Sequence, residues 1–64
     1  MPKTYSSKEL IKIVKEDGWV LFSVTGSHHQ FKHATKKGKV TIPHPKKDVP
    51  MGTAHSIFRQ AGLK

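Results

Sequence analysis

The residues of this chain that could do chemistry gather in one short segment, Val24-Thr25-Gly26-Ser27-His28-His29-Gln30-Phe31-Lys32-His33. The segment combines a Gly-Ser turn, a pair of adjacent histidines and a basic strand. Histidine has an unperturbed pKa of about 6.5, so its side chain can accept and donate a proton near neutral pH. Because His28 directly follows the turn, it lies at the mouth of a strand, where a ligand can reach it. The segment therefore predicts proton transfer at a histidine.

The length and the charge of the chain limit what kind of protein it is. With 64 residues there is room for one small domain, spanning residues 1–64. A domain of this size buries only about 60% of the surface of its unfolded chain, so we expect a shallow, open working surface. Twelve Lys and Arg residues stand against four acidic ones, for a net charge of +8. This excess favours a polyanionic partner, either nucleic acid or an acidic protein.

Composition also excludes several classes of protein. The chain has no cysteine, which excludes disulfides and thiolate metal sites. No apolar run approaches the roughly 20 residues that cross a bilayer, and the N-terminus lacks the apolar core of a signal peptide. The sequence therefore predicts a cytoplasmic protein without a membrane segment.

The first predicted element is an amphipathic helix. Ser6 and Glu9 have the spacing of a capping box, so the helix should begin near Ser7. Gly18 supplies the left-handed conformation that often closes a helix, which places the helix end one or two residues earlier. The apolar residues of this segment share one arc of a helical wheel: Leu10, Ile11, Ile13 and Val14. One face of the helix is therefore buried.

Three strands are predicted after this helix. Aromatic and β-branched residues favour a strand over Trp19–Val24. A second strand runs from about His28 to His33 after a tight turn, and a third covers Lys39–Ile42, where Pro43 ends it. The three strands form an antiparallel meander.

A second helix follows, and it completes the fold. Its apolar residues again share one arc (Ala54, Ile57, Phe58 and Ala61), and it ends at Gly62. Three strands need such a cover on one face to form a core. The order predicts an α+β fold, α-β-β-β-α, with a three-stranded antiparallel sheet, two helices on one face and the other face open.

Strand alternation assigns side chains to the two faces of the sheet. Phe31, Val40 and Ile42 should point at the helices, and by parity His29 and His33 join them. The open face then carries His28, Gln30, Lys32, Lys39 and Thr41. A bulge at Gly26 or Ser27 would exchange the faces of His28 and His29. The first strand has apolar residues on both sides: Val20, Phe22 and Val24 on one, Trp19 and Leu21 on the other. Either side of it can be the buried one.

Taken in order, four segments resemble the HicA family of toxin-antitoxin ribonucleases (mRNA interferases), and the match covers nearly the whole chain. The segments are Asp17-Gly18-Trp19, Gly26-Ser27-His28-His29-Gln30-Phe31-Lys32-His33, Val40-Thr41-Ile42-Pro43-His44-Pro45, and Pro50-Met51-Gly52-Thr53 with Gln60-Ala61-Gly62. The resemblance implies a fold like the double-stranded-RNA-binding domain, cleavage of mRNA, and neutralisation by a HicB-type antitoxin. It maps the family's catalytic histidine onto His28 and the preceding glycine onto Gly26. Ala34 departs from the family, where many relatives carry proline.

Ribonuclease chemistry needs few groups, because RNA carries its own nucleophile, the 2'-hydroxyl. His28 can be the general base, and Lys32 and Lys39 are plausible phosphate contacts. Backbone N–H groups around Gly26 and Ser27 can also approach a phosphate, since glycine has no side chain. Three sources of the leaving-group proton stay open: His44, His28 itself and solvent. No cofactor or metal is expected. The remaining basic loop residues (Lys36, Lys37, Lys46 and Lys47) are expected to be solvated, and His29 and His33 to be packed at the rim of the core.

Two other functions compete with this hypothesis. A metal enzyme is disfavoured because His29 and His33 lie about 13 Å apart on an extended strand, at roughly 3.3 Å per residue, and His28 points away from them. The acidic residues are scattered, which disfavours two-metal chemistry. A non-catalytic RNA-binding module of the double-stranded-RNA-binding type would use the same basic face, and composition does not exclude it.

Overall fold

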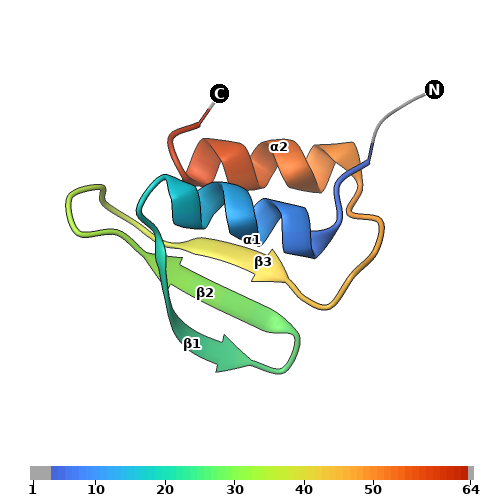
Figure 1. Ribbon diagram of the computed structural model, residues 1–64, viewed down its shortest axis with the longest axis horizontal. Coiled ribbons are helices and arrows are strands. Elements are labelled where there is room, and N and C mark those ends of the chain that lie inside the picture. Colours follow the sequence, from blue (N-terminus) through green and yellow to red (C-terminus); the bar gives the residue numbers. More distant parts are fainter. Residues whose placement is uncertain (1–3, 64) are drawn as a thin grey trace.

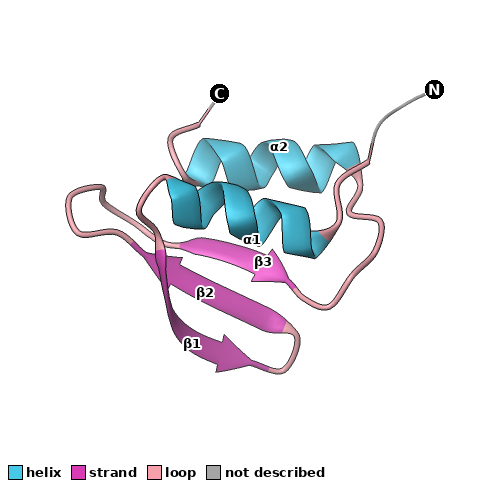
Figure 2. Cartoon of the chain, in the orientation of Figure 1, coloured by secondary structure: helices cyan, strands magenta, loops and turns pink. Residues whose placement is uncertain are grey.

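The computed structural model describes residues 4–63, which form the predicted α-β-β-β-α order (Figures 1 and 2). The elements are α1 (Ser7–Glu16), β1 (Val20–Thr25), β2 (His28–Lys32), β3 (Val40–Pro43) and α2 (Met51–Gln60). The strands form an antiparallel sheet in the order β1-β2-β3. The predicted α+β fold is confirmed. No helix within residues 4–63 is long and apolar enough to cross a membrane.

Local signals set both ends of α1. The Ser6 hydroxyl accepts a hydrogen bond from the Glu9 N–H, and the Glu9 carboxylate accepts one from the Ser6 N–H, which is the predicted capping box. At the other end the Asp17 N–H donates to the last turn of the helix, and Gly18 turns the chain with φ at 103°. The helix therefore begins and ends where the sequence predicts.

The hydrophobic core lies between the two helices and β2 and β3. Both helices pack against β3, whereas β1 is the strand farthest from them (Figure 1). The fully buried apolar side chains come from every element except β1: Leu10, Val14, Trp19, Phe31, Val40, Ile42, Val49, Ala54, Ile57 and Ala61. The three apolar strand residues predicted to face the helices are among them. The core therefore fixes the orientation of β2 and β3.

Neither face of β1 is buried, whereas the sequence left open which of its two faces would be. Val20, Leu21, Phe22 and Val24 are 59%, 40%, 44% and 53% exposed. Trp19, which was expected to open this strand, lies one residue before it and is only 1% exposed. Its indole Nε1–H donates to the Asp17 carboxylate at 3.1 Å. Trp19 thus anchors the end of α1 to the core, and β1 extends from it as an uncovered edge strand.

A bulge at Phe22 changes the predicted faces of β1. Leu21 pairs with Phe31 and Ser23 pairs with Gln30, so Phe22 is the extra residue. Val24 then pairs with His29 and lies on the same side as Leu21, which corrects the predicted grouping of Val24 with Val20 and Phe22. The bulge lies in β1, so the alternation of β2 is undisturbed.

Three other predicted bounds are wrong by one residue. β2 ends at Lys32, so His33 lies just after it, and β3 begins at Val40, so Lys39 lies in the loop before it. β3 includes Pro43, which pairs with His28 at the end of the ladder. A proline is tolerated there because β3 is an edge strand of the sheet.

Candidate active site and adjoining pocket

A tight turn presents His28 to solvent. Thr25 pairs with His28, so Gly26 and Ser27 alone connect β1 and β2. Gly26 has φ at 59°, a conformation that glycine adopts without steric cost, and a Cβ at this position would meet no atom within 4 Å. The Ser27 carbonyl accepts the His44 N–H at 2.7 Å, which fixes the far side of the turn. The turn is therefore held firmly while its outer surface stays open.

The two adjacent histidines lie on opposite faces of the sheet, as predicted. Along β2, His28 is exposed, His29 is half-buried and Phe31 is fully buried, so His29 and Phe31 face the helices. His28 and Lys32 alternate with them and face the open side. The bulge that would exchange His28 and His29 does not occur at the turn.

Of the two lysines expected to contact phosphate, Lys32 lies on the open face at some distance from His28, and Lys39 lies outside the sheet. Lys32 is four residues from His28 on the same strand, or about 13 Å at roughly 3.3 Å per residue. Its ammonium lies 5.7 Å from the centre of the Phe22 ring, and a hollow of about 360 Å³ adjoins it, lined by Val20, Lys32, His33 and Ala34. Lys39 is exposed in the loop before β3. Gly26 and Ser27 are the predicted site residues nearest to His28 in the chain.

His33 is a structural histidine. Its Nδ1 accepts hydrogen bonds from the N–H groups of Thr35 and Lys36, both at 3.1 Å, and its Nε2–H donates to the Asp17 carbonyl at 2.8 Å. The ring also meets Trp19 edge to face, with ring centres 5.1 Å apart. With both nitrogens engaged, His33 ties the β2–β3 loop to the end of α1.

Lys36 is not the solvated loop charge that the sequence suggests. Its ammonium forms a salt bridge with the Asp17 carboxylate and donates to the Ala61 carbonyl at 3.0 Å. The hydrogen bond and the positive charge of Lys36 lower the pKa of Asp17, although partial desolvation opposes them. Lys36 therefore joins the C-terminal ends of both helices.

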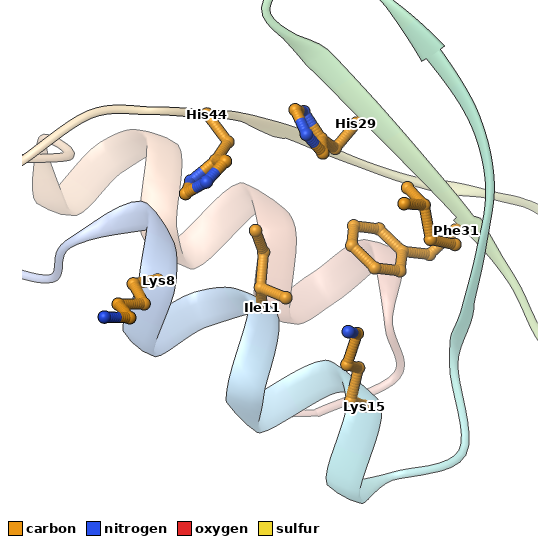
Figure 3. Close-up of a pocket in the computed structure, with 7 residues that line it drawn as sticks. Lys8, Ile11, Lys15, His29, Phe31 and His44 are labelled. Atoms are coloured by element: carbon orange, nitrogen blue, oxygen red, sulfur yellow. The ribbon is translucent and has the colours of Figure 1, made fainter.

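On the helix side of the hairpin lies a pocket that the sequence analysis missed, with a volume of about 250 Å³. It lies between α1 and β2, and Figure 3 draws its lining residues around the opening. The lining residues are Lys8, Ile11 and Lys15 of α1, Leu21 of β1, His29 and Phe31 of β2, and His44. The protein therefore has a small pocket in addition to the shallow surface expected for a small domain.

Two histidines form one wall of this pocket. The rings of His29 and His44 meet edge to face, with centres 4.9 Å apart and planes at 84°. The Ser7 hydroxyl lies 2.6 Å from Nδ1 of His44 and accepts the Lys46 N–H at 2.9 Å. Nδ1 of His29 is buried and has no hydrogen-bond partner among the described residues. Within residues 4–63, no three His, Asp or Glu side chains are grouped so that they could hold a metal ion.

These features define a class of protein: a small basic α+β domain, similar to the double-stranded-RNA-binding domain, with an exposed histidine after a Gly-Ser turn. Residues 7–63 match the family model of the HicA toxin of bacterial toxin-antitoxin systems. The chain therefore belongs to the HicA toxin family and is a toxin of this kind.

A solved structure supports the same assignment. A chain in a toxin-antitoxin complex from Streptococcus pneumoniae is 27% identical to this one, with a TM-score of 0.75. The match covers 91% of this chain and 97% of the pneumococcal one, so the two share essentially the whole fold. Among curated proteins, none is a significant match.

Proposed function

We propose that this toxin is an endoribonuclease that cleaves mRNA, with His28 as the general base. The observation that carries the proposal is the position of His28, an exposed imidazole directly after the Gly26-Ser27 turn on the open face of a chain with a net charge of +8. Membership of the HicA family supports it, because in that family the histidine after Gly-Ser is the catalytic one. A histidine so placed can reach a backbone ribose without a deep cleft.

The reaction follows from the substrate's own nucleophile. His28 removes the proton of a 2'-hydroxyl, the 2'-oxygen attacks the adjacent phosphorus, and the bond from phosphorus to the 5'-oxygen breaks. The products are a 2',3'-cyclic phosphate and a 5'-hydroxyl end. The N–H groups at Gly26 and Ser27 are the nearest candidates to stabilise the developing negative charge. Lys32, farther along the open face, and Lys39, in the loop before β3, hold the flanking phosphates.

The leaving 5'-oxygen also needs a proton. Protonated His28 can return the proton it has taken, and solvent reaches this exposed face freely. His44 is less suited to this step, since its ring packs against Ser7 and His29 on the opposite side of the sheet. We therefore assign proton return to His28 or to water.

We further propose that a HicB-type antitoxin inhibits the toxin by covering this face. The structural match to a chain of a toxin-antitoxin complex supports such a partner. On the open face His28 and Lys32 are accompanied by Val20, which pairs with Lys32, and by Phe22, whose ring lies under the Lys32 ammonium. An inhibitor with carboxylates opposite the two basic groups and apolar side chains opposite Val20 and Phe22 would complement this surface.

The test is incubation of the purified toxin with RNA in EDTA, followed by analysis of the product ends. We expect cleavage that persists in chelator, leaves cyclic phosphate and 5'-hydroxyl ends, and stops when the antitoxin is added. Cleavage that requires Mg²⁺ or Zn²⁺ would contradict the mechanism. Binding of RNA without any cleavage would instead identify a non-catalytic RNA-binding module.

A further inference from the structure

We infer that the pocket between α1 and the β1–β2 hairpin is a second RNA subsite, which binds one nucleotide next to the cleaved phosphate. This inference rests on the proposed ribonuclease function and adds a contact surface on the opposite side of the sheet from His28. The nucleobase enters the pocket, and its phosphate lies at the lysine rim.

The size and the walls of the pocket suit a single flat ring system. Its volume is about 250 Å³, which is below the range of about 300 to 1,000 Å³ that is typical of sites for drug-sized ligands. Ile11, Phe31 and Leu21 supply apolar walls, and the crossed rings of His29 and His44 supply aromatic ones. Single-stranded nucleic acid is commonly held by such combinations of a basic groove and rings on which bases stack.

The rim of the pocket is suited to an anion. Lys8 and Lys15 are seven residues apart on α1, which places both on the same side of the helix two turns apart. Both side chains are exposed, and Figure 3 shows them on either side of Ile11 at the pocket. None of the lining residues is acidic. A phosphate at this rim therefore meets positive charge without a competing carboxylate.

His44 supplies the polar group that can read the edge of a base. The Ser7 hydroxyl is hydrogen-bonded to Nδ1 of His44 at 2.6 Å. Ser7 is itself fixed, because it is 1% exposed and accepts a hydrogen bond from the Lys46 N–H. The ring of His44 is thus held in one orientation, which leaves Nε2 as its remaining hydrogen-bonding atom. A fixed ring nitrogen beside apolar walls is the kind of group that orients a bound ligand.

The pocket and His28 lie on the two sides of the β1–β2 hairpin, close to its turn. His28 and His29 are consecutive residues on opposite faces of β2, and the His44 N–H bonds the Ser27 carbonyl at 2.7 Å. An RNA strand that passes around the exposed Gly26-Ser27 turn therefore meets His28 on one side and the pocket on the other. We assign the pocket to RNA rather than to the antitoxin because its lining combines cations with stacking rings.

Binding of a 2'-O-methyl oligouridylate tests this subsite, since that RNA lacks the nucleophile and stays intact with wild-type protein. We expect K8Q/K15Q to bind at least tenfold more weakly than wild type. The matched control K37Q/K47Q removes the same charge from two exposed loop lysines outside the pocket, and it should lose less than about threefold. A stacked base contributes a factor of about 5 to 150 in affinity, so filling the pocket with L21W should lower affinity by about tenfold.

NMR signals of the histidine rings give a second measure of binding, which does not require removing charge from the protein. On addition of the oligonucleotide the NMR signals of the His29 and His44 ring nitrogens should shift. Those of His33 should not, because His33 is bonded to Asp17 and Lys36 beyond the end of β2 that lies farthest from the hairpin turn. The subsite would be overturned if both double variants lost the same affinity for the oligonucleotide and the His29 and His44 signals did not move. The proposed function would stand in that case, provided that the wild-type protein still cleaves unmodified RNA. Failure of wild-type protein to cleave unmodified RNA would instead remove the proposed function. Variants that lose only antitoxin inhibition would assign the pocket to the protein partner and overturn the inference.

Discussion

Gly18 is the position where the structure predicts the largest effect of adding a single methyl group. Its φ is 103°, and a Cβ there would lie 2.8 Å from Nε2 of His33. For a residue with a side chain, left-handed backbone costs about 1 to 2 kcal/mol. The His33 ring cannot move aside without loosening its bonds to Asp17, Thr35 and Lys36. Losing one such bond costs about 0.5 to 1.5 kcal/mol.

The two costs for Gly18→Ala add to about 1.5 to 3.5 kcal/mol. For a domain of this size each kcal/mol lowers Tm by about 4 to 8 °C, so a fall of about 6 to 28 °C is expected in thermal unfolding. Gly52→Ala is the control, because Gly52 lies in α2 and a Cβ there meets no atom within 4 Å. Removing a helical glycine should stabilise the protein by up to about 1 kcal/mol.

A double-mutant cycle separates the clash from the backbone strain. In a His33→Ala background the clash is absent, so Gly18→Ala should cost only the backbone part, about 1 to 2 kcal/mol. A Gly18→Ala protein that melts within about 2 °C of wild type, or a cycle without coupling, would refute the packing of His33 against Gly18 described above.

Two further predictions concern charge. RNA affinity should fall steeply with salt in a binding titration, with a log-log slope of about 0.7 for each neutralised phosphate of a single strand, and a slope near zero would show that the +8 charge is incidental. The Lys36 ammonium lowers the pKa of Asp17 below its ordinary 3.8. A carboxyl whose pKa is lower in the folded state stabilises the fold above its unfolded pKa, and this contribution is lost as pH falls through the folded value. The Tm difference between wild type and Lys36→Met should therefore be full at about pH 6 and shrink as pH falls below 3.8; a difference that does not change with pH would contradict the ion pair.

The parts of the fold that depend on neighbouring residues could be predicted from the sequence. The start of α1 was predicted correctly because Ser6 and Glu9 bond within one turn of the helix. The faces of β2 were predicted because alternation is a local property of a strand, and buried Phe31 fixes which side is inside. The burial of β1 was not predictable, since its pattern is apolar on both sides and the bulge at Phe22 depends on pairing with β2.

The parts of the site that depend on distant residues were missed. The pocket exists because Ser7 bonds His44 across 37 positions of the sequence and because side chains of α1 lie opposite His29 and Phe31 of β2. No residue spacing in the sequence predicts such a contact. The one available signal was the position of His44 between two prolines, which indicates that it is held in a stiff loop. In the same way Lys36 resembles its solvated neighbour Lys37 until the fold brings it to Asp17.

The RNA cleavage rates and melting temperatures of His28→Ala and His29→Ala, measured side by side, decide whether His28 is the general base. His28→Ala should lower kcat about 10²-fold or more, with Tm and RNA affinity nearly unchanged, because His28 is exposed and acts as a general base. His29→Ala should lose about 1 to 2 kcal/mol of stability through lost packing and keep part of its kcat. A fully active His28→Ala protein beside a folded but inactive His29→Ala protein would contradict the central claim.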